Sequence, residues 1–184
     1  MRTRTLILTL SLVAFTMLGT LGTVASAQRG TGSAVQMPKY DTAADIADLP
    51  FYGRWRINVA KSTQNGSRAN SDTFTWIFRR EGDMVRHDIY DVYPADKPSR
   101  SYAVKLNGSQ SPDPHAVGIG ETISWWPINK SMMFREVRQN GAPTQRTMYS
   151  VSADGKVFTS QSWSPTKPNE TGRSNLMYFD RQPD

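Results

Sequence analysis

The sequence predicts an all-β protein, a closed, antiparallel, up-and-down β-barrel of about 8–10 strands with a short helix before its first strand. From residue 51 onward, apolar side chains recur with a period of two, which is the spacing of a strand that buries one face. Turn-forming residues interrupt these runs about every 8–15 residues, and no long amphipathic helix separates them. Short connections favour antiparallel pairing of successive strands, and closing the sheet removes its exposed edges.

Residues 51–62 are the stretch on which this prediction depends most. Alternation places Trp55, Ile57 and Val59 on one face of an extended segment, with two arginines and an asparagine on the other. The segment therefore reads as the first strand of the barrel, with one face in the core.

The rest of the chain repeats this alternation, which makes about nine predicted strands in all. Asn140-Gly141 and Asp154-Gly155 are the strongest turn signals, because such pairs adopt the positive backbone angles of a tight hairpin turn. Pro127 is predicted to end a strand. The further strands are expected at residues 73–78, 84–93, 101–106, 121–126, 132–139, 145–151, 157–163 and 175–181.

Residues 1–27 have the pattern of a secretory signal peptide. Two arginines form a basic start, residues 6–24 are almost wholly apolar or small, and Ala-Ser-Ala at residues 25–27 supplies the small-x-small cleavage pattern. The alternative is an uncleaved anchor, because the apolar run is about as long as a membrane-spanning helix needs. Polar and small residues dilute that run, so we predict cleavage after Ala27, export to the periplasm or the medium, and no stable membrane span afterwards.

Residues 28–50 are predicted to be a flexible spacer before a barrel domain at residues 51–184. The spacer begins with glycine, serine and threonine and offers little to bury. The short helix is expected within residues 40–49, with Asp41 as its N-cap and Pro50 after its last turn.

The composition narrows the classes of function. Without residues 1–27 and their two arginines, the 184-residue chain has 157 residues, enough for one domain, and its formal charge falls from +6 to +4. The chain has no cysteine, so packing rather than disulfides must stabilise it. Its basic residues are scattered singly or in pairs, so nucleic acid is not expected as a partner.

Gly-Arg-Trp-Arg-Ile-Asn-Val-Ala-Lys-Ser at residues 53–62 resembles the first motif of the lipocalins and their calycin relatives. It is most similar to the opening of a group of exported, largely uncharacterised bacterial lipocalin-like proteins. Residues 150–156 resemble the Ser-x-Asp-Gly-Lys hairpin of the same group. The resemblance implies an antiparallel barrel with an internal cavity that often holds a small apolar molecule. It also implies that Trp55 packs at the closed end of the barrel under an arginine, either Arg181 or Arg173.

Few residues suit metal or cofactor chemistry. His87 and His115 are the only histidines, and their spacing does not indicate metal ligation. The chain has no cysteine nucleophile and no Gly-x-Ser-x-Gly motif, and Gly-Ile-Gly at residues 118–120 lacks the rest of a dinucleotide-binding motif. We therefore expect no metal and no cofactor.

The candidate ligand-binding residues are aromatic residues of the predicted strands and two arginines. Rings in a barrel of this size either fill the core or line a pocket. Inward-pointing arginines would favour a carboxylate or phosphate head group, whereas the cost of an unpaired buried charge favours an outward, solvated arrangement. The residues are Trp76, Tyr102, Trp125, Arg135, Arg146 and Tyr149.

His87 is the candidate catalytic residue. If Val85, His87 and Ile89 point inward, the imidazole could act as a general base near neutral pH. If the face with Met84 and Arg86 points inward, His87 meets water instead. A shift of one residue in register exchanges the two faces, so both alternatives stand.

The sequence therefore predicts an exported barrel that binds a small hydrophobic or amphipathic molecule. A first alternative is a cofactor-independent lyase, isomerase or hydrolase that uses His87, a tyrosine and an arginine in the same cavity. A second alternative is a structural module of the cell envelope that meets a partner through its surface or sheet edge and has no cavity.

Overall fold

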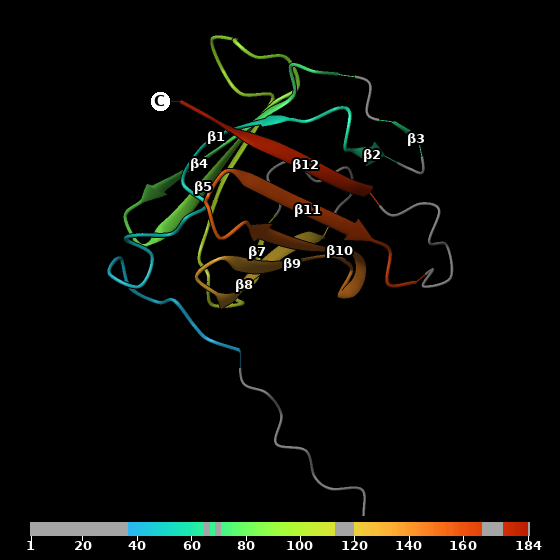
Figure 1. Cartoon of the computed structure of the whole chain (residues 1–184). Coiled ribbons are helices and arrows are strands. Elements are labelled where there is room, and N and C mark those ends of the chain that lie inside the picture. The colour runs from blue at the N-terminus through green and yellow to red at the C-terminus, as the bar shows by residue number, and fades with distance from the viewer. Residues whose placement is uncertain (1–36, 65–66, 69–70, 113–119, 167–174, 184) are drawn as a thin grey trace, which may run out of the picture. The chain divides into compact units, whose positions relative to one another are not determined.

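The computed structural model describes residues 37–64, 67–68, 71–112, 120–166 and 175–183, all within one compact unit, Gln36–Asp184 (Figure 1). The predicted signal peptide and its cleavage site lie outside the described residues. Over these described ranges, no helix has the length and apolar character needed to cross a membrane.

Antiparallel strands make up the fold, and the described ranges contain no α-helix. The described ranges contain twelve strands, and three of these are only two residues long. The strands are β1 (Gly53–Ile57), β2 (Thr63–Gln64), β3 (Ser67–Arg68), β4 (Thr75–Glu81), β5 (Met84–Tyr90), β6 (Arg100–Val104), β7 (Ser111–Pro112), β8 (Glu121–Asn129), β9 (Met132–Gln139), β10 (Ala142–Val151), β11 (Val157–Trp163) and β12 (Asn175–Gln182).

Ten strands form a nearly closed barrel in the order β6-β5-β4-β1-β12-β11-β10-β9-β8-β7 (Figure 1). The last strand pairs with the first, so that Arg181 of β12 lies opposite Trp55 of β1. The short strands β2 and β3 pair beside β12, off this path. The predicted all-β, antiparallel, up-and-down architecture is confirmed.

The barrel closes less completely than predicted. Within the described part of the chain, no strand ladder joins β6 to β7 at the two ends of the path. A backbone hydrogen bond links the segment after β6 to β8, from the Gly108 N–H to the Trp125 carbonyl oxygen at 2.8 Å. Gly108 has a φ of 81°, and a Cβ there would lie 2.0 Å from Nε1 of Trp126. Glycine is therefore required where the indole of Trp126 covers this edge.

The segment before β1 forms consecutive turns rather than the predicted helix. Its hydrogen bonds join residues three apart, as from the Asp45 N–H to the Thr42 carbonyl oxygen at 3.2 Å. Thr42 takes the capping place expected of Asp41, because Thr42 Oγ1 accepts the Asp45 N–H at 3.3 Å. A single turn is too short to be stable as an α-helix by itself, and the burial of Ile46 and Leu49 decides its conformation.

Trp55 closes one end of the barrel together with this turn segment. Its ring is fully buried, and its Nε1 donates to the Phe51 carbonyl oxygen at 2.7 Å. The Arg181 guanidinium lies 4.1 Å from the centroid of the Trp55 ring and donates to the Tyr52 carbonyl oxygen at 2.7 Å. Arg181 is therefore the arginine that the resemblance implies, whereas Arg173 lies outside the described residues.

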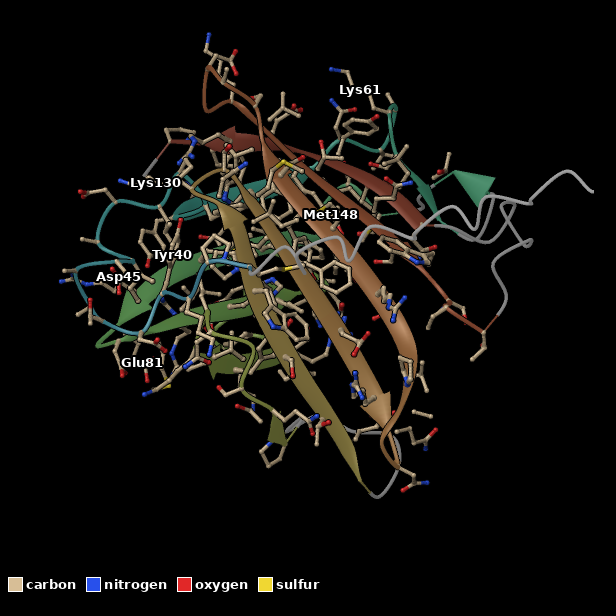
Figure 2. All side chains as sticks on the ribbon, turned by 90° about the horizontal axis from the view of Figure 1, so that it is seen from below. Tyr40, Asp45, Lys61, Glu81, Lys130 and Met148 are labelled. Atoms are coloured by element: carbon tan, nitrogen blue, oxygen red, sulfur yellow. The ribbon has the colours of Figure 1, made fainter. Side chains whose placement is uncertain are left out.

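The hairpin turns β4–β5 and β8–β9 mark the same end of the molecule. Figure 2 shows Tyr40 and Asp45 of the turn segment on the same side as Glu81 and Lys130, which lie at those two turns. The turn segment is thus packed at this end of the barrel.

The predicted strand positions are close to those observed. Residues 132–139 and 157–163 coincide with β9 and β11. β8 does not end at Pro127 but continues to Asn129, and the ladder shifts register between these residues because proline lacks an N–H. At the Asn140-Gly141 hairpin both φ angles are positive, 51° and 81°, whereas at Asp154-Gly155 only the glycine has a positive φ, of 70°.

Candidate functional site

A cavity of about 240 Å³ lies inside the barrel. Phe158 of β11 packs on Trp55 with ring centroids 5.5 Å apart, whereas Ser160 and Ser162, further along the same strand, line the cavity. The cavity therefore lies towards the end of the barrel away from Trp55. Inward-facing residues of seven strands line it, together with one residue that precedes β4. The lining is Phe74, Trp76, His87, Ile89, Arg100, Tyr102, Arg135, Gln145, Tyr149, Ser160, Ser162, Asn175 and Met177.

Four of the six predicted ligand-binding residues line this cavity, namely Trp76, Tyr102, Arg135 and Tyr149. Trp125 is fully buried behind them, where its ring stacks on that of Tyr149 with centroids 5.0 Å apart and an interplanar angle of 18°. Arg146 lies on the outer face of β10, and its Nε donates to the Glu136 carboxylate at 2.9 Å. The structure therefore brings together four of these residues and separates Arg146 from them.

The preference for an outward orientation is correct for Arg146 and wrong for Arg135. In the ladder between β9 and β10, Arg135 lies opposite the buried Thr147, whereas Arg146 lies opposite Glu136. The Arg135 guanidinium is not left without a partner, because its Nη1 donates to Gln145 Oε1 at 3.2 Å. A hydrogen-bonded guanidinium at a cavity wall avoids much of the cost of an isolated buried charge.

His87 points inward, so the inward alternative is correct. The side chain is 1% exposed, its ring stacks on that of Phe78 with centroids 4.1 Å apart, and Nδ1 lies 2.8 Å from the Tyr102 hydroxyl. Burial lowers the pKa of His87 well below its ordinary value, and the positive charges of Arg135 and Arg100 lower it further. The imidazole is therefore neutral at neutral pH.

The cavity has a positive electrostatic character. Arg135 and Arg100 both contribute to its wall, and within the described part of the chain no aspartate or glutamate does. Arg100 is exposed, and its Nη2 also contacts the Asp91 carboxylate at 3.3 Å, which places it at the rim. No three metal-ligating side chains cluster among the residues that the structure describes, and His115 lies outside them.

Three uncharged lining residues each have a buried polar atom without a hydrogen-bond partner among the described residues. The atoms are the indole Nε1 of Trp76, Nε2 of His87 and Oγ of Ser160. An unsatisfied buried polar group costs about 1–3 kcal/mol, so such groups generally meet water or a ligand. These atoms make the inner wall of the cavity polar as well as aromatic.

The sequence analysis missed most of the polar lining. Ser160 and Ser162 share the inward face of β11 with Phe158, and Arg100 shares that of β6 with Tyr102. Strand alternation could have identified all three. Serine and arginine are also typical of solvated strand faces, so these residue types do not by themselves indicate a cavity wall.

Comparisons with known proteins support the fold. No protein-family model matches the sequence, and no curated protein matches it. Solved structures share this fold, among them those of a fluorescent protein and a fatty acid binding protein. A crystal structure of a point mutant of the fluorescent protein UnaG has a TM-score of 0.53 and 13% identity, over 73% of this chain and 98% of that one. A Schistosoma mansoni fatty acid binding protein in complex with arachidonic acid has a TM-score of 0.51 and 12% identity, over 73% and 97%.

This likeness concerns the fold alone, because fewer than one residue in five is identical in either alignment. The chain has the calycin-like architecture that the resemblance implies, with a barrel that is nearly rather than fully closed.

Proposed function

We propose that this protein is an exported barrel that binds a small hydrophobic or amphipathic molecule in its internal cavity. The observation that carries the proposal is the cavity itself, which is bordered by aromatic rings, two arginines and three unpaired polar atoms. A core built only for stability would fill such a space and pair such atoms. The alternative of a structural module required an interior without a cavity, so the cavity argues against it.

Two further observations support the proposal. The Schistosoma mansoni protein that shares the fold was solved in complex with arachidonic acid, a small amphipathic molecule. The pattern of residues 1–27 supports export, since it has the basic start, apolar run and small-residue site of a signal peptide.

Native mass spectrometry of the protein isolated from its own cell envelope tests both parts of the proposal. We expect a chain that begins at Gln28, because cleavage is predicted after Ala27. We also expect an additional mass in the native spectrum that disappears on denaturation. If the native mass equals the denatured mass, and tryptophan fluorescence does not respond to fatty acids, terpenoids or phenolics, the binding function is wrong.

Catalysis without a cofactor is the second candidate, and the environment of His87 favours it. Its neutral imidazole has one nitrogen 2.8 Å from the Tyr102 hydroxyl, while the other, Nε2, belongs to the cavity wall and has no partner among the described residues. In the tautomer whose Nδ1–H donates to the Tyr102 hydroxyl oxygen, Nε2 is the acceptor nitrogen and can take a proton from a bound molecule. The test is to incubate the protein with the molecule released from it and to follow conversion by mass. Replacing His87 with glutamine keeps a polar side chain in the wall, so it should lower the rate of conversion far more than it weakens binding, and an unchanged rate would exclude His87.

A further inference from the structure

The chemistry of the cavity wall differs from that of a simple pocket for an acyl chain. Only Ile89 and Met177 among the described lining residues are aliphatic. The others are aromatic, cationic, or neutral and polar. A long aliphatic chain in this space would remove water from the unpaired polar atoms and give them no partner, which is costly.

The size of the cavity also favours a short ligand. Its volume is about 240 Å³, below the range of roughly 300–1,000 Å³ that is usual for pockets that hold drug-sized molecules. A ligand with one or two rings suits this volume better than a long flexible chain does.

Aromatic rings surround this space on several sides. Trp76 and Tyr149 meet edge to face with centroids 5.9 Å apart, and Trp76 meets His87 in the same way at 4.9 Å. Tyr102 lies beyond His87, with ring centroids 5.1 Å apart. Rings in such arrangements offer both faces and edges, and they bind a flat aromatic ligand well.

Positive charge and uncharged polar atoms both contribute to the cavity wall. Arg135 and Arg100 supply guanidinium groups, which form strong paired hydrogen bonds with a carboxylate. The unpaired Trp76 Nε1, His87 Nε2 and Ser160 Oγ can bond to substituents on a ring, and the indole can only donate.

We propose that the ligand of this cavity is a compact aromatic carboxylate, with its carboxylate on Arg135, its ring among Trp76, Tyr102 and Tyr149, and a polar ring substituent on the unpaired inner atoms. This inference rests on the proposed binding function and narrows it. Arg100, at the rim, adds to the attraction for the anion.

Isothermal titration calorimetry on the purified chain tests the inference with a panel of aromatic carboxylates: benzoate, 4-hydroxybenzoate, 4-hydroxycinnamate and indole-3-acetate. Two comparison probes are palmitate and 4-hydroxycinnamyl alcohol, which keeps the ring of 4-hydroxycinnamate and lacks its charge. At least one aromatic carboxylate should bind, and the alcohol should bind about 10–100-fold more weakly than 4-hydroxycinnamate, because a charge-assisted pair is lost.

A matched pair of variants locates the carboxylate. Arg135→Gln should weaken binding of the best aromatic carboxylate by about 10–100-fold. Arg146→Gln removes the same charge from the outer face of the neighbouring strand and should leave binding within about twofold, because Arg146 pairs with Glu136. The comparison of acid with alcohol needs no variant, so it decides the question even if Arg135→Gln does not fold.

The outcomes separate this inference from the proposed function. Binding of palmitate without binding of any aromatic carboxylate would overturn the inference and leave the binding function intact. No binding of any probe, together with no additional mass in the native protein, would overturn both. Equal affinity of the acid and the alcohol, or unchanged affinity in Arg135→Gln, would also overturn the inference.

Discussion

Replacing Trp55 with alanine is expected to lower the free energy of unfolding by about 3–5 kcal/mol. The side chain is fully buried, packs on Phe158 with ring centroids 5.5 Å apart, and donates to the Phe51 carbonyl oxygen at 2.7 Å. Its loss would leave a void at the closed end of the barrel and remove the surface on which the Arg181 guanidinium lies. Urea denaturation followed by circular dichroism measures the effect.

Two further variants test whether this loss comes from the packing of Trp55 in particular. Trp55→Phe keeps an aromatic ring and should recover more than half of the lost stability. Trp163 lies partly exposed, beside Phe134 at a centroid distance of 6.2 Å, and Trp163→Ala should cost less than half as much as Trp55→Ala. A similar loss of unfolding free energy at both positions would contradict the conclusion that the packing of Trp55 stabilises the closed end of the barrel.

Acidification below about pH 6.5, the ordinary pKa of histidine, is expected to destabilise the protein through His87. Burial, with the charges of Arg135 and Arg100, holds the pKa of His87 well below that value in the folded protein. Between the folded and unfolded pKa values, the unfolded chain therefore binds a proton that the folded chain does not. Stability is full above about pH 6.5 and falls as the pH decreases, by up to about 1.4 kcal/mol per pH unit.

Unfolding free energies measured between pH 7.5 and pH 5 test this slope. The window avoids most carboxylate titration, because Glu81, Asp83 and Asp154 all have pKa values lowered, chiefly by side-chain hydrogen bonds. His87→Gln should abolish most of the slope whatever its effect on stability at pH 7.5, whereas His115→Gln should retain it. Equal slopes in the wild type and His87→Gln would mean that burial of His87 is not responsible.

The fold could be predicted largely from local pattern. Tyr102, Val104 and Leu106 alternate along the chain and are all buried. The bounds predicted for the strands at residues 132–139 and 157–163 are those of β9 and β11. Side chains two residues apart point to the same side of a strand, whichever strands lie beside it. The alternation is therefore a local property that can be recognised in the sequence alone.

The sequence did not determine which of the two faces of a strand points into the barrel. For His87 and Arg135 the sequence allowed an outward as well as an inward orientation of the side chain, and both residues line the cavity. Alternation says which residues share a face, but the partner strands decide which face meets the core, and a shift of one residue exchanges the two. The ladder with β10 determines the orientation of Arg135, because it places Arg135 opposite the buried Thr147.

The sequence by itself determined the longer strands, their antiparallel succession and the motif around Trp55, because these follow from alternation, turn residues and short connections. The two-residue strands β2, β3 and β7 carry no such pattern and were not predicted. Tertiary structure decided the rest. Pairing of β12 with β1 nearly closes the barrel. The segment expected to be a helix forms turns, in which Ile46 and Leu49 are buried. The cavity lining comes from seven different strands. Each of these depends on contacts between residues far apart in the chain, which no local pattern specifies.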